Sequence, residues 1–126
     1  MTLLSATPVL RSGDFPRAKA FYMDGLGFCC VEEAGEPAGF GIFIRDKAPV
    51  FAEAHQGAEA ACGRRWAYVH VDDFDAAVAE LEGSGVAFSS APTVTEHGMG
   101  EVEVTDPDGN VLCSGADADD AGPGAA

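Results

Sequence analysis

Residues 8–15 (PVLRSGDF) and residues 68–74 (YVHVDDF) are two versions of one motif, about half a chain apart. In each, an apolar strand leads into an Asp–Phe pair, so that Asp14 superposes on Asp73, and a helical stretch follows. One copy of this size could hardly bury its own sheet, so the two copies are expected to share a core. Their concave faces are then the natural place for a ligand.

The first copy predicts a β-α-β-β-β module over about residues 3–56. Apolar residues recur at helical spacing through residues 17–25, Asp14 can cap that helix, and Pro16 is tolerated in its first turn. Gly25 or Gly27 is expected to end it. The expected strands are residues 3–11, 28–33, 40–45 and 50–55.

The second copy predicts the same order over about residues 65–115. Asp73 caps a helix at residues 76–83, and a type I turn is expected where the chain reads Asp-Pro-Asp-Gly. The expected strands are residues 66–71, one or two short strands at residues 86–88 and 93–96, and residues 101–105 and 111–113. Residues 56–64 form a linker, and residues 116–126 form a disordered acidic tail, so that residues 1–115 make one domain.

The charge of the chain limits its partners. A net charge of −14, from 21 acidic and 7 basic residues, argues against nucleic acid, whose phosphates need a basic surface. A cationic ligand would be attracted, although the charge is equally explained by solubility alone. The chain has no run of 18 apolar residues and no basic leader, so we expect neither a membrane span nor a signal peptide, and we expect the cytoplasm.

The cysteines do not indicate a metal site. Cys29, Cys30, Cys62 and Cys113 show no CxxC spacing. Adjacent residues on a strand point to opposite faces, so Cys29 and Cys30 are not expected to pair. All four are predicted to be free thiols that serve as small core residues.

These segments resemble a known family. The double β-α-β-β-β order, with Phe21-Tyr22, Leu26-Gly27-Phe28 and residues 106–110 (DPDGN), resembles the glyoxalase, bleomycin-resistance and extradiol-dioxygenase superfamily, the vicinal oxygen chelate proteins. Residues 97–110 (HGMGEVEVTDPDGN) look most like the bleomycin-resistance type, with His97 where an aromatic residue is typical. The resemblance implies an α+β fold of two tandem modules, with half-barrel sheets, outer helices and a homodimer whose clefts are shared between subunits.

The resemblance also implies where a metal would bind. The metal-using members have ligands at positions that fall on Thr7, Trp66 and Cys113. Thr and Trp are unusual ligands for a divalent metal, and a lone Cys suits a soft one. We therefore predict no metal, no other cofactor and no catalytic residue. One alternative is a metal-dependent enzyme of the glyoxalase or dioxygenase type with displaced ligands, for example His70 and Glu103.

What remains is a cleft suited to a cationic or aromatic small molecule. The residues predicted to bind it are Trp66, Tyr68, His70, His97, Glu101, Glu103 and Arg11. The aromatic residues could instead belong to core or dimer packing, the glutamates to a solvated strand face, and His97 to an exposed loop. The leading hypothesis is a bleomycin-resistance-like protein that sequesters its ligand, for example an antibiotic. A metal-free enzyme with His70 or His97 as general base and a glutamate is a further alternative.

Overall fold

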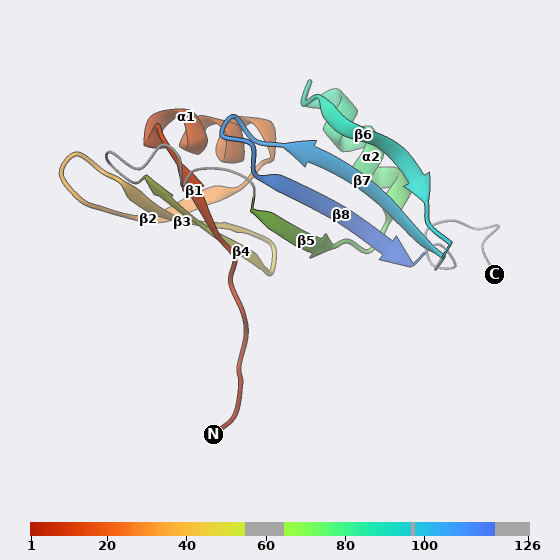
Figure 1. The fold of residues 1–126 in the computed structure, drawn as a ribbon, viewed down its shortest axis with the longest axis horizontal. Helices are drawn as coiled ribbons and strands as arrows, with labels where there is room; N and C mark the ends of the chain where they lie inside the picture. The colour runs from red at the N-terminus through yellow and green to blue at the C-terminus, as the bar shows by residue number, and fades with distance from the viewer. Residues whose placement is uncertain (55–64, 97, 118–126) are drawn as a thin grey trace.

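Two four-stranded mixed sheets, each with helical segments, make up the chain (Figure 1). The structure is a computed structural model that describes residues 1–54, 65–96 and 98–117. The first module comprises β1 (Val9–Ser12), α1 (Phe15–Ala20), η1 (Phe21–Gly25), β2 (Cys29–Ala34), β3 (Phe40–Arg45) and β4 (Ala48–Ala54). The second comprises β5 (Trp66–His70), α2 (Phe74–Gly83), β6 (Phe88–Val94), β7 (Met99–Thr105) and β8 (Val111–Asp117).

The two sheets have the same topology. Their strand orders are β1-β4-β3-β2 and β5-β8-β7-β6. In each, the first strand runs parallel to the last, and the other neighbours are antiparallel. The predicted α+β fold of two β-α-β-β-β modules is therefore confirmed. None of the helices in the described part of the chain is long and apolar enough to cross a membrane.

Some predicted bounds were wrong at the ends of the chain. The first strand begins at Val9, and Leu3 and Leu4 before it are exposed, because they pair with no neighbouring strand in the described residues. The last strand continues to Asp117, past the predicted start of the tail at residue 116, because its pairing with β7 extends to Met99. The rest of the predicted tail lies outside the described residues, as does the whole of the predicted linker.

Two internal elements also differ from the prediction. The first helix begins at Phe15, and its second half, η1, is a π-helix; spacing of apolar residues alone does not distinguish that form. Residues 86–88 and 93–96, where one or two short strands were predicted, contribute to a single strand, β6 at Phe88–Val94, whose register shifts twice against β7. Such bulges let a strand with weak alternation pair continuously.

The repeat in the sequence is also a repeat in the packing. The side chain of Asp14 accepts a hydrogen bond from the Arg17 amide at 3.1 Å, and that of Asp73 accepts one from the Ala76 amide at 3.0 Å. Each cap is followed by a buried phenylalanine that lies on a glycine of the sheet beneath it. A Cβ added at Gly41 would lie 2.9 Å from the Phe15 ring, and one at Gly100 would lie 2.7 Å from the Phe74 ring.

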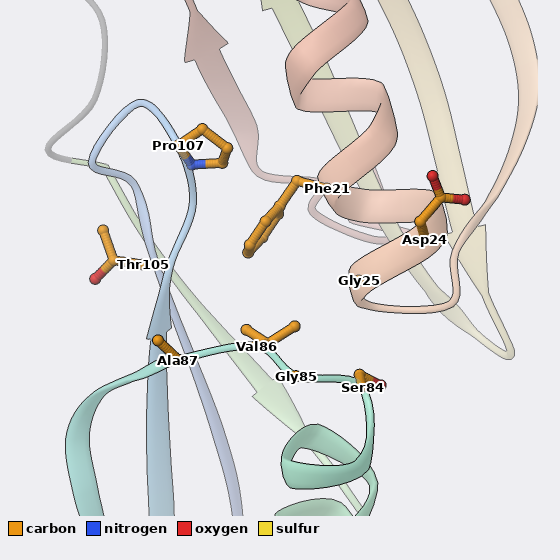
Figure 2. Close-up of a pocket in the computed structure, with 9 residues that line it drawn as sticks. All are labelled: Phe21, Asp24, Gly25, Ser84, Gly85, Val86, Ala87, Thr105 and Pro107. Atoms are coloured by element: carbon orange, nitrogen blue, oxygen red, sulfur yellow. The ribbon is translucent and has the colours of Figure 1, made fainter.

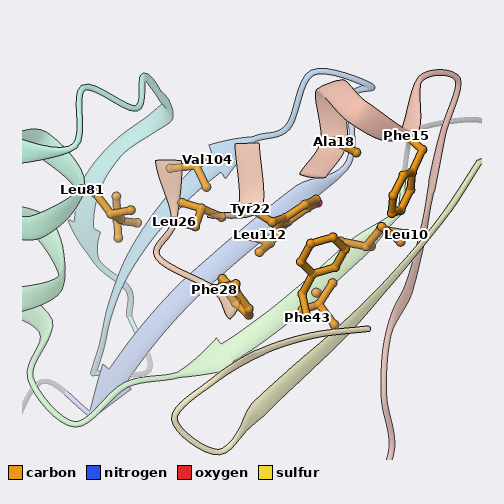
Figure 3. Close-up of a cluster of buried hydrophobic side chains, with 14 of the residues drawn as sticks. Leu10, Phe15, Ala18, Tyr22, Leu26, Phe28, Phe43, Leu81, Val104 and Leu112 are labelled. Carbon is orange, nitrogen blue, oxygen red and sulfur yellow. The ribbon is translucent and has the colours of Figure 1, made fainter. Parts of the chain in front are cut away.

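A single hydrophobic core joins the modules. Buried side chains from α1, η1 and the first sheet meet those of the second sheet and α2 (Figure 3). Tyr22 and Phe43, both fully buried, lie with ring centroids 5.8 Å apart. Figure 3 shows Tyr22 and Leu26 beside Leu112 and Val104 of the second sheet. Neither module therefore has a core of its own.

The turn between β7 and β8 fastens the second module to the first. Tyr22 in η1 donates a hydrogen bond to Asp106 Oδ2 at 2.6 Å, and burial together with that carboxylate raises the pKa of Tyr22 far above its ordinary value. The Asn110 side chain donates to Asp106 at 2.8 Å and to the Arg11 carbonyl at 2.9 Å. Asp108 accepts from the Gly13 amide at 3.0 Å. The motif predicted as a simple turn therefore also connects the modules. We call these hydrogen bonds of Tyr22, Asp106, Asp108 and Asn110 the clasp.

A second link lies at the end of β3. Arg45 donates to the Leu26 carbonyl at 3.0 Å and to Glu80 of α2 at 2.7 Å, with a second contact to the same carboxylate. The hydrogen bond between the two side chains, together with their opposite charges, raises the pKa of Arg45 and lowers the pKa of Glu80. Desolvation opposes both shifts. The pair is partly exposed, so solvent screens it and it contributes less than the buried clasp.

Replacing Tyr22 by Phe should destabilise the protein. The substitution keeps the ring but removes the donor to the buried Asp106 carboxylate, which costs about 1–3 kcal/mol. Urea unfolding measures the loss. The control is Tyr68→Phe, since Tyr68 is partly exposed and should lose well under half as much. Equal losses in the two variants would contradict the importance of the clasp.

Gly100→Ala should also destabilise the protein, by about 1–3 kcal/mol, because the new methyl group must displace the Phe74 ring from the core. Gly83→Ala is the matched control, since a Cβ there meets nothing within 4 Å and Ala favours a helix by up to about 1 kcal/mol. Thermal unfolding of both variants distinguishes them. A Gly100→Ala protein as stable as wild type would show that Phe74 can move freely.

Candidate functional site

The face of the second sheet turned away from α2 gathers most of the predicted ligand-binding residues. Helix α2 packs on β7 and β8, where Val102, Val104 and Leu112 are buried beneath it. Because side chains alternate along a strand, the residues between these point the other way. We call that side the open face, formed by Trp66, Tyr68 and His70 of β5, Val111, Cys113 and Gly115 of β8, and Glu101 and Glu103 of β7.

Strand register arranges the open face in rows. Trp66 lies opposite Val111. Tyr68 lies opposite Cys113, which in turn lies opposite Glu103. His70 lies opposite Gly115, which lies opposite Glu101. Two aromatic residues and a histidine thus line one edge of the sheet, with two carboxylates across from them.

Five of the seven predicted residues share this face. Arg11 does not: it lies on β1 of the first sheet, opposite Glu53 of β4, and its Nε is buried with no hydrogen-bond partner in the described residues. His97 lies outside the described residues. The predicted parity of Glu101 and Glu103 against Val102 and Val104 is confirmed, since the glutamates are half-buried and the valines fully buried.

The aromatic residues of the open face are exposed. Trp66 has 63% of its surface accessible and Tyr68 has 43%, whereas Ala67 between them is buried. Within one chain, core packing is therefore not what holds these two side chains. Neighbouring large aromatic side chains that are exposed to solvent are typical of ligand-binding or protein–protein interaction surfaces.

Tyr68 is held by polar contacts at this surface. Its hydroxyl donates to Glu101 Oε2 at 2.8 Å, and its ring centroid lies 5.0 Å from that of His70. Desolvation first, and the hydrogen bond to Glu101 second, raise the pKa of Tyr68 to about 12. The hydroxyl therefore stays protonated and remains a donor throughout the physiological pH range.

Cys113 is buried at the centre of the face. Burial first, and then the charges of Glu101 and Glu103, raise the pKa of its thiol to about 11. A protonated thiol is a poor nucleophile and a poor metal ligand. Its core role is confirmed, but that of Cys29 was wrong: Cys29 is exposed, because it lies on β2 at the edge of the first sheet, and Cys30 is half-buried. Cys62 lies outside the described residues.

The family's metal positions do not fit a metal in this chain. Thr7 and Trp66 offer no usual ligand, which leaves Cys113 as a single thiol where a divalent ion needs three or four protein ligands. Across residues 1–54, 65–96 and 98–117, no three His, Cys, Asp or Glu side chains are grouped closely enough to hold an ion. His70 and Glu103 share the open face but have no third such partner within that part of the chain.

Two surface pockets lie away from the open face. One of about 480 Å³ lies between the end of η1, the connection from α2 to β6, and the end of β7 (Figure 2). Its wall includes Phe21, Val86 and Pro107, with Asp24 as its ionisable group. The other, of about 300 Å³, lies along β2 and includes Lys19 and Cys30. In the second pocket Lys19 is paired with Glu33 at 2.6 Å in a partly exposed salt bridge. The open face remains the better candidate because it alone of the three places exposed aromatic side chains beside carboxylates.

Comparison with known proteins assigns the family. A model of the glyoxalase/bleomycin resistance protein/dioxygenase superfamily matches residues 5–113. The chain belongs to this superfamily. No curated protein sequence matches the chain.

Superfamily members of known structure superpose well on the chain. A bleomycin resistance determinant encoded on the transposon Tn5 is 28% identical, with a TM-score of 0.76 over 91% of this chain and 98% of that one. A bleomycin-binding protein complexed with bleomycin is also 28% identical, with a TM-score of 0.75 over 90% and 98%. A lactoylglutathione lyase from Agrobacterium tumefaciens is 20% identical, with a TM-score of 0.74 over 90% and 92%, which shows a shared fold alone.

Sequence reasoning missed two residues that shape the site. Gly115 was expected at the end of the module, beyond the last predicted strand at residues 111–113, yet it is a buried strand residue beneath Tyr68. Asp106 was read as a turn residue, yet it receives the Tyr22 hydroxyl across 84 positions of sequence. A glycine within a strand is a known sign of close approach, but the end of β8 gave no strand signal strong enough to apply it.

Alkylation should distinguish the cysteines of the superfamily member. With its pKa raised to about 11, only about one Cys113 thiol in a thousand is a thiolate at pH 8, and burial blocks the reagent as well. Peptide mapping after iodoacetamide at pH 8 should find Cys29 modified and Cys113 intact, with Cys113 reacting faster as the pH rises toward 11. In urea both should react. Equal rates in the folded protein would contradict the environment assigned to Cys113.

Proposed function

We propose that this superfamily member binds a cationic or aromatic small molecule on the open face, as a bleomycin-resistance-like binding protein without catalysis or bound metal. The observation that carries the proposal is the exposure of Trp66 and Tyr68 beside the carboxylates of Glu101 and Glu103. Similarity to a bleomycin-binding protein in complex with its ligand supports a small-molecule partner. An antibiotic of that type is the first ligand to test.

The chemistry of the face favours cations and flat rings. A cation over the face of Trp or Tyr gains about 0.5–2 kcal/mol. Glu101 and Glu103 add attraction for positive charge, and the net charge of −14 draws cations toward the protein before contact. An anionic ligand would meet repulsion from the same groups.

The residues at the family's metal positions support binding without a metal. Thr7, Trp66 and the lone thiol of Cys113 do not make a set of ligands for a divalent ion. The lactoylglutathione lyase shares the fold with this chain at 20% identity, and one fold of this kind hosts several activities. A displaced site based on His70 and Glu103 would need a third ligand from outside the described residues or from another chain.

We further propose that the protein is a homodimer whose second copy helps to enclose the ligand. The open face presents Trp66 and Tyr68 to solvent, and the two pockets described above lie elsewhere on the chain. An exposed aromatic surface of this kind is typical of an interaction site. Sedimentation velocity at micromolar concentration tests the dimer.

Trp66→Ala should weaken binding of metal-free bleomycin by about 2- to 30-fold, the loss of about 0.5–2 kcal/mol of cation–π and stacking energy. Isothermal titration calorimetry measures it, and because Trp66 is the chain's single tryptophan, quenching of wild-type fluorescence reports on the same site. The melting temperature should stay within a few degrees, since Trp66 is 63% exposed.

Val94→Ala is the matched control. Val94 is equally exposed, at 63%, but by register with Gly100 it lies on the helix side of the sheet. It should leave the affinity unchanged. Unchanged affinity in Trp66→Ala would overturn the assignment of the site, and stoichiometric Ni, Zn, Fe or Mn in purified protein would favour the metal-dependent enzyme instead.

A further inference from the structure

The side chain of Tyr68 extends sideways over β8 instead of projecting straight out from its backbone position on β5. Its Cα partner on β8 is Cys113, yet its hydroxyl reaches Glu101 of β7, which belongs to the next row. Between them lies Gly115, the partner of both His70 and Glu101. A Cβ added at Gly115 would lie 1.9 Å from the Tyr68 hydroxyl oxygen and 2.6 Å from the ring carbon that bears it. The ring reaches Glu101 because Gly115 has no side chain.

The first module shows that the fold itself does not require this arrangement. Asp14 and Asp73 cap equivalent helices, so Val9 occupies the position of Tyr68, and Arg11 that of His70. Arg11 lies opposite Glu53, whereas His70 lies opposite Gly115. The first sheet thus has neither the tyrosine nor the glycine, although it has the same strand order. The pair is a property of the open face of the second module.

The surroundings of the ring are negative. Tyr68 directs its own proton at Glu101, so it offers a ligand its ring face, of which a substantial part is open to solvent. Glu103 lies on the same side of β7, two residues on. The same two carboxylates raise the pKa of the Cys113 thiol between the strands, an independent sign of their field. Asp117, at the end of β8, adds further negative charge near the same end of the sheet.

We propose that Tyr68, held on Glu101 across Gly115, selects a planar cation of the amidinium or guanidinium type over a neutral molecule of the same shape, and that Gly115 is the positioning residue for Tyr68. The inference rests on the proposed binding function of the open face and names its ligand class. The flat cation stacks on the Tyr68 ring while its N–H groups face the carboxylates, which accept charge-assisted hydrogen bonds. A neutral amide of equal shape lacks the charge that both contacts use.

Benzamidine and benzamide form a matched pair of probes, planar and nearly isosteric, with and without the positive charge. Titration followed by NMR, through the single Trp66 indole resonance, should show benzamidine binding at least 5-fold more tightly than benzamide. Gly115→Ala should reduce the benzamidine affinity at least 3-fold, because the new methyl group moves Tyr68 off Glu101. Tyr68→Phe, which keeps the ring and the strand pairing, should reduce it as well.

A double-mutant cycle separates positioning from a general structural effect. If Gly115 acts through Tyr68, Gly115→Ala should cost no further affinity in a Tyr68→Ala background. An equal loss in both backgrounds, equal affinities for the two probes, or no binding of benzamidine would each overturn the inference. Bleomycin is titrated in parallel: if it binds and benzamidine shows no preference, the inference alone fails. If benzamidine shows the preference and bleomycin does not bind, the antibiotic proposal alone fails.

Discussion

The buried carboxylate of Asp106 is the contact on which the rest of the structure depends. It accepts the Tyr22 hydroxyl of the first module, the Asn110 side chain, and the amides of its own turn. A carboxylate buried in this way would be costly unless donors surrounded it, and here they come from both modules. The carboxylate thus joins the two modules, and the turn that carries it connects β7 and β8, the strands of Glu101, Glu103 and Cys113. Neither module has a complete hydrophobic core by itself.

The two modules share one backbone plan, but the sides of their sheets that face away from the helices carry different residues. The helix caps, the phenylalanine-on-glycine packing and the strand orders are shared by both modules. These features lie on the helix side, where packing restricts the choice of residue. The opposite sides have diverged: one pairs Arg11 with Glu53 by register, and the other lays Tyr68 over Gly115. The proposed binding residues thus lie where the fold constrains the sequence least.

Part of the candidate site could be predicted from the sequence. Strand parity was enough to predict that Trp66, Tyr68 and His70 share a side with one another, and that Glu101 and Glu103 oppose the buried valines. Parity could not show that β5 and β7 lie on either side of β8, since that depends on the parallel pairing of β5 with β8, in which Trp66 lies opposite Val111, 45 positions later in the sequence. Nor could parity show that Arg11 belongs to the other sheet, where it lies on β1.

By itself, the sequence determined the two-module plan, the helix caps Asp14 and Asp73 and the alternation of the strands, because capping, turns and side-chain period are local properties of a few adjacent residues. The resemblance of its motifs to the superfamily also came from the sequence and is confirmed by the match over residues 5–113. Only the tertiary structure decided that η1 is a π-helix, that Tyr22 closes on Asp106, and that Gly115 makes room for Tyr68. The last two depend on contacts between residues distant in sequence, which come together only when the sheets pair.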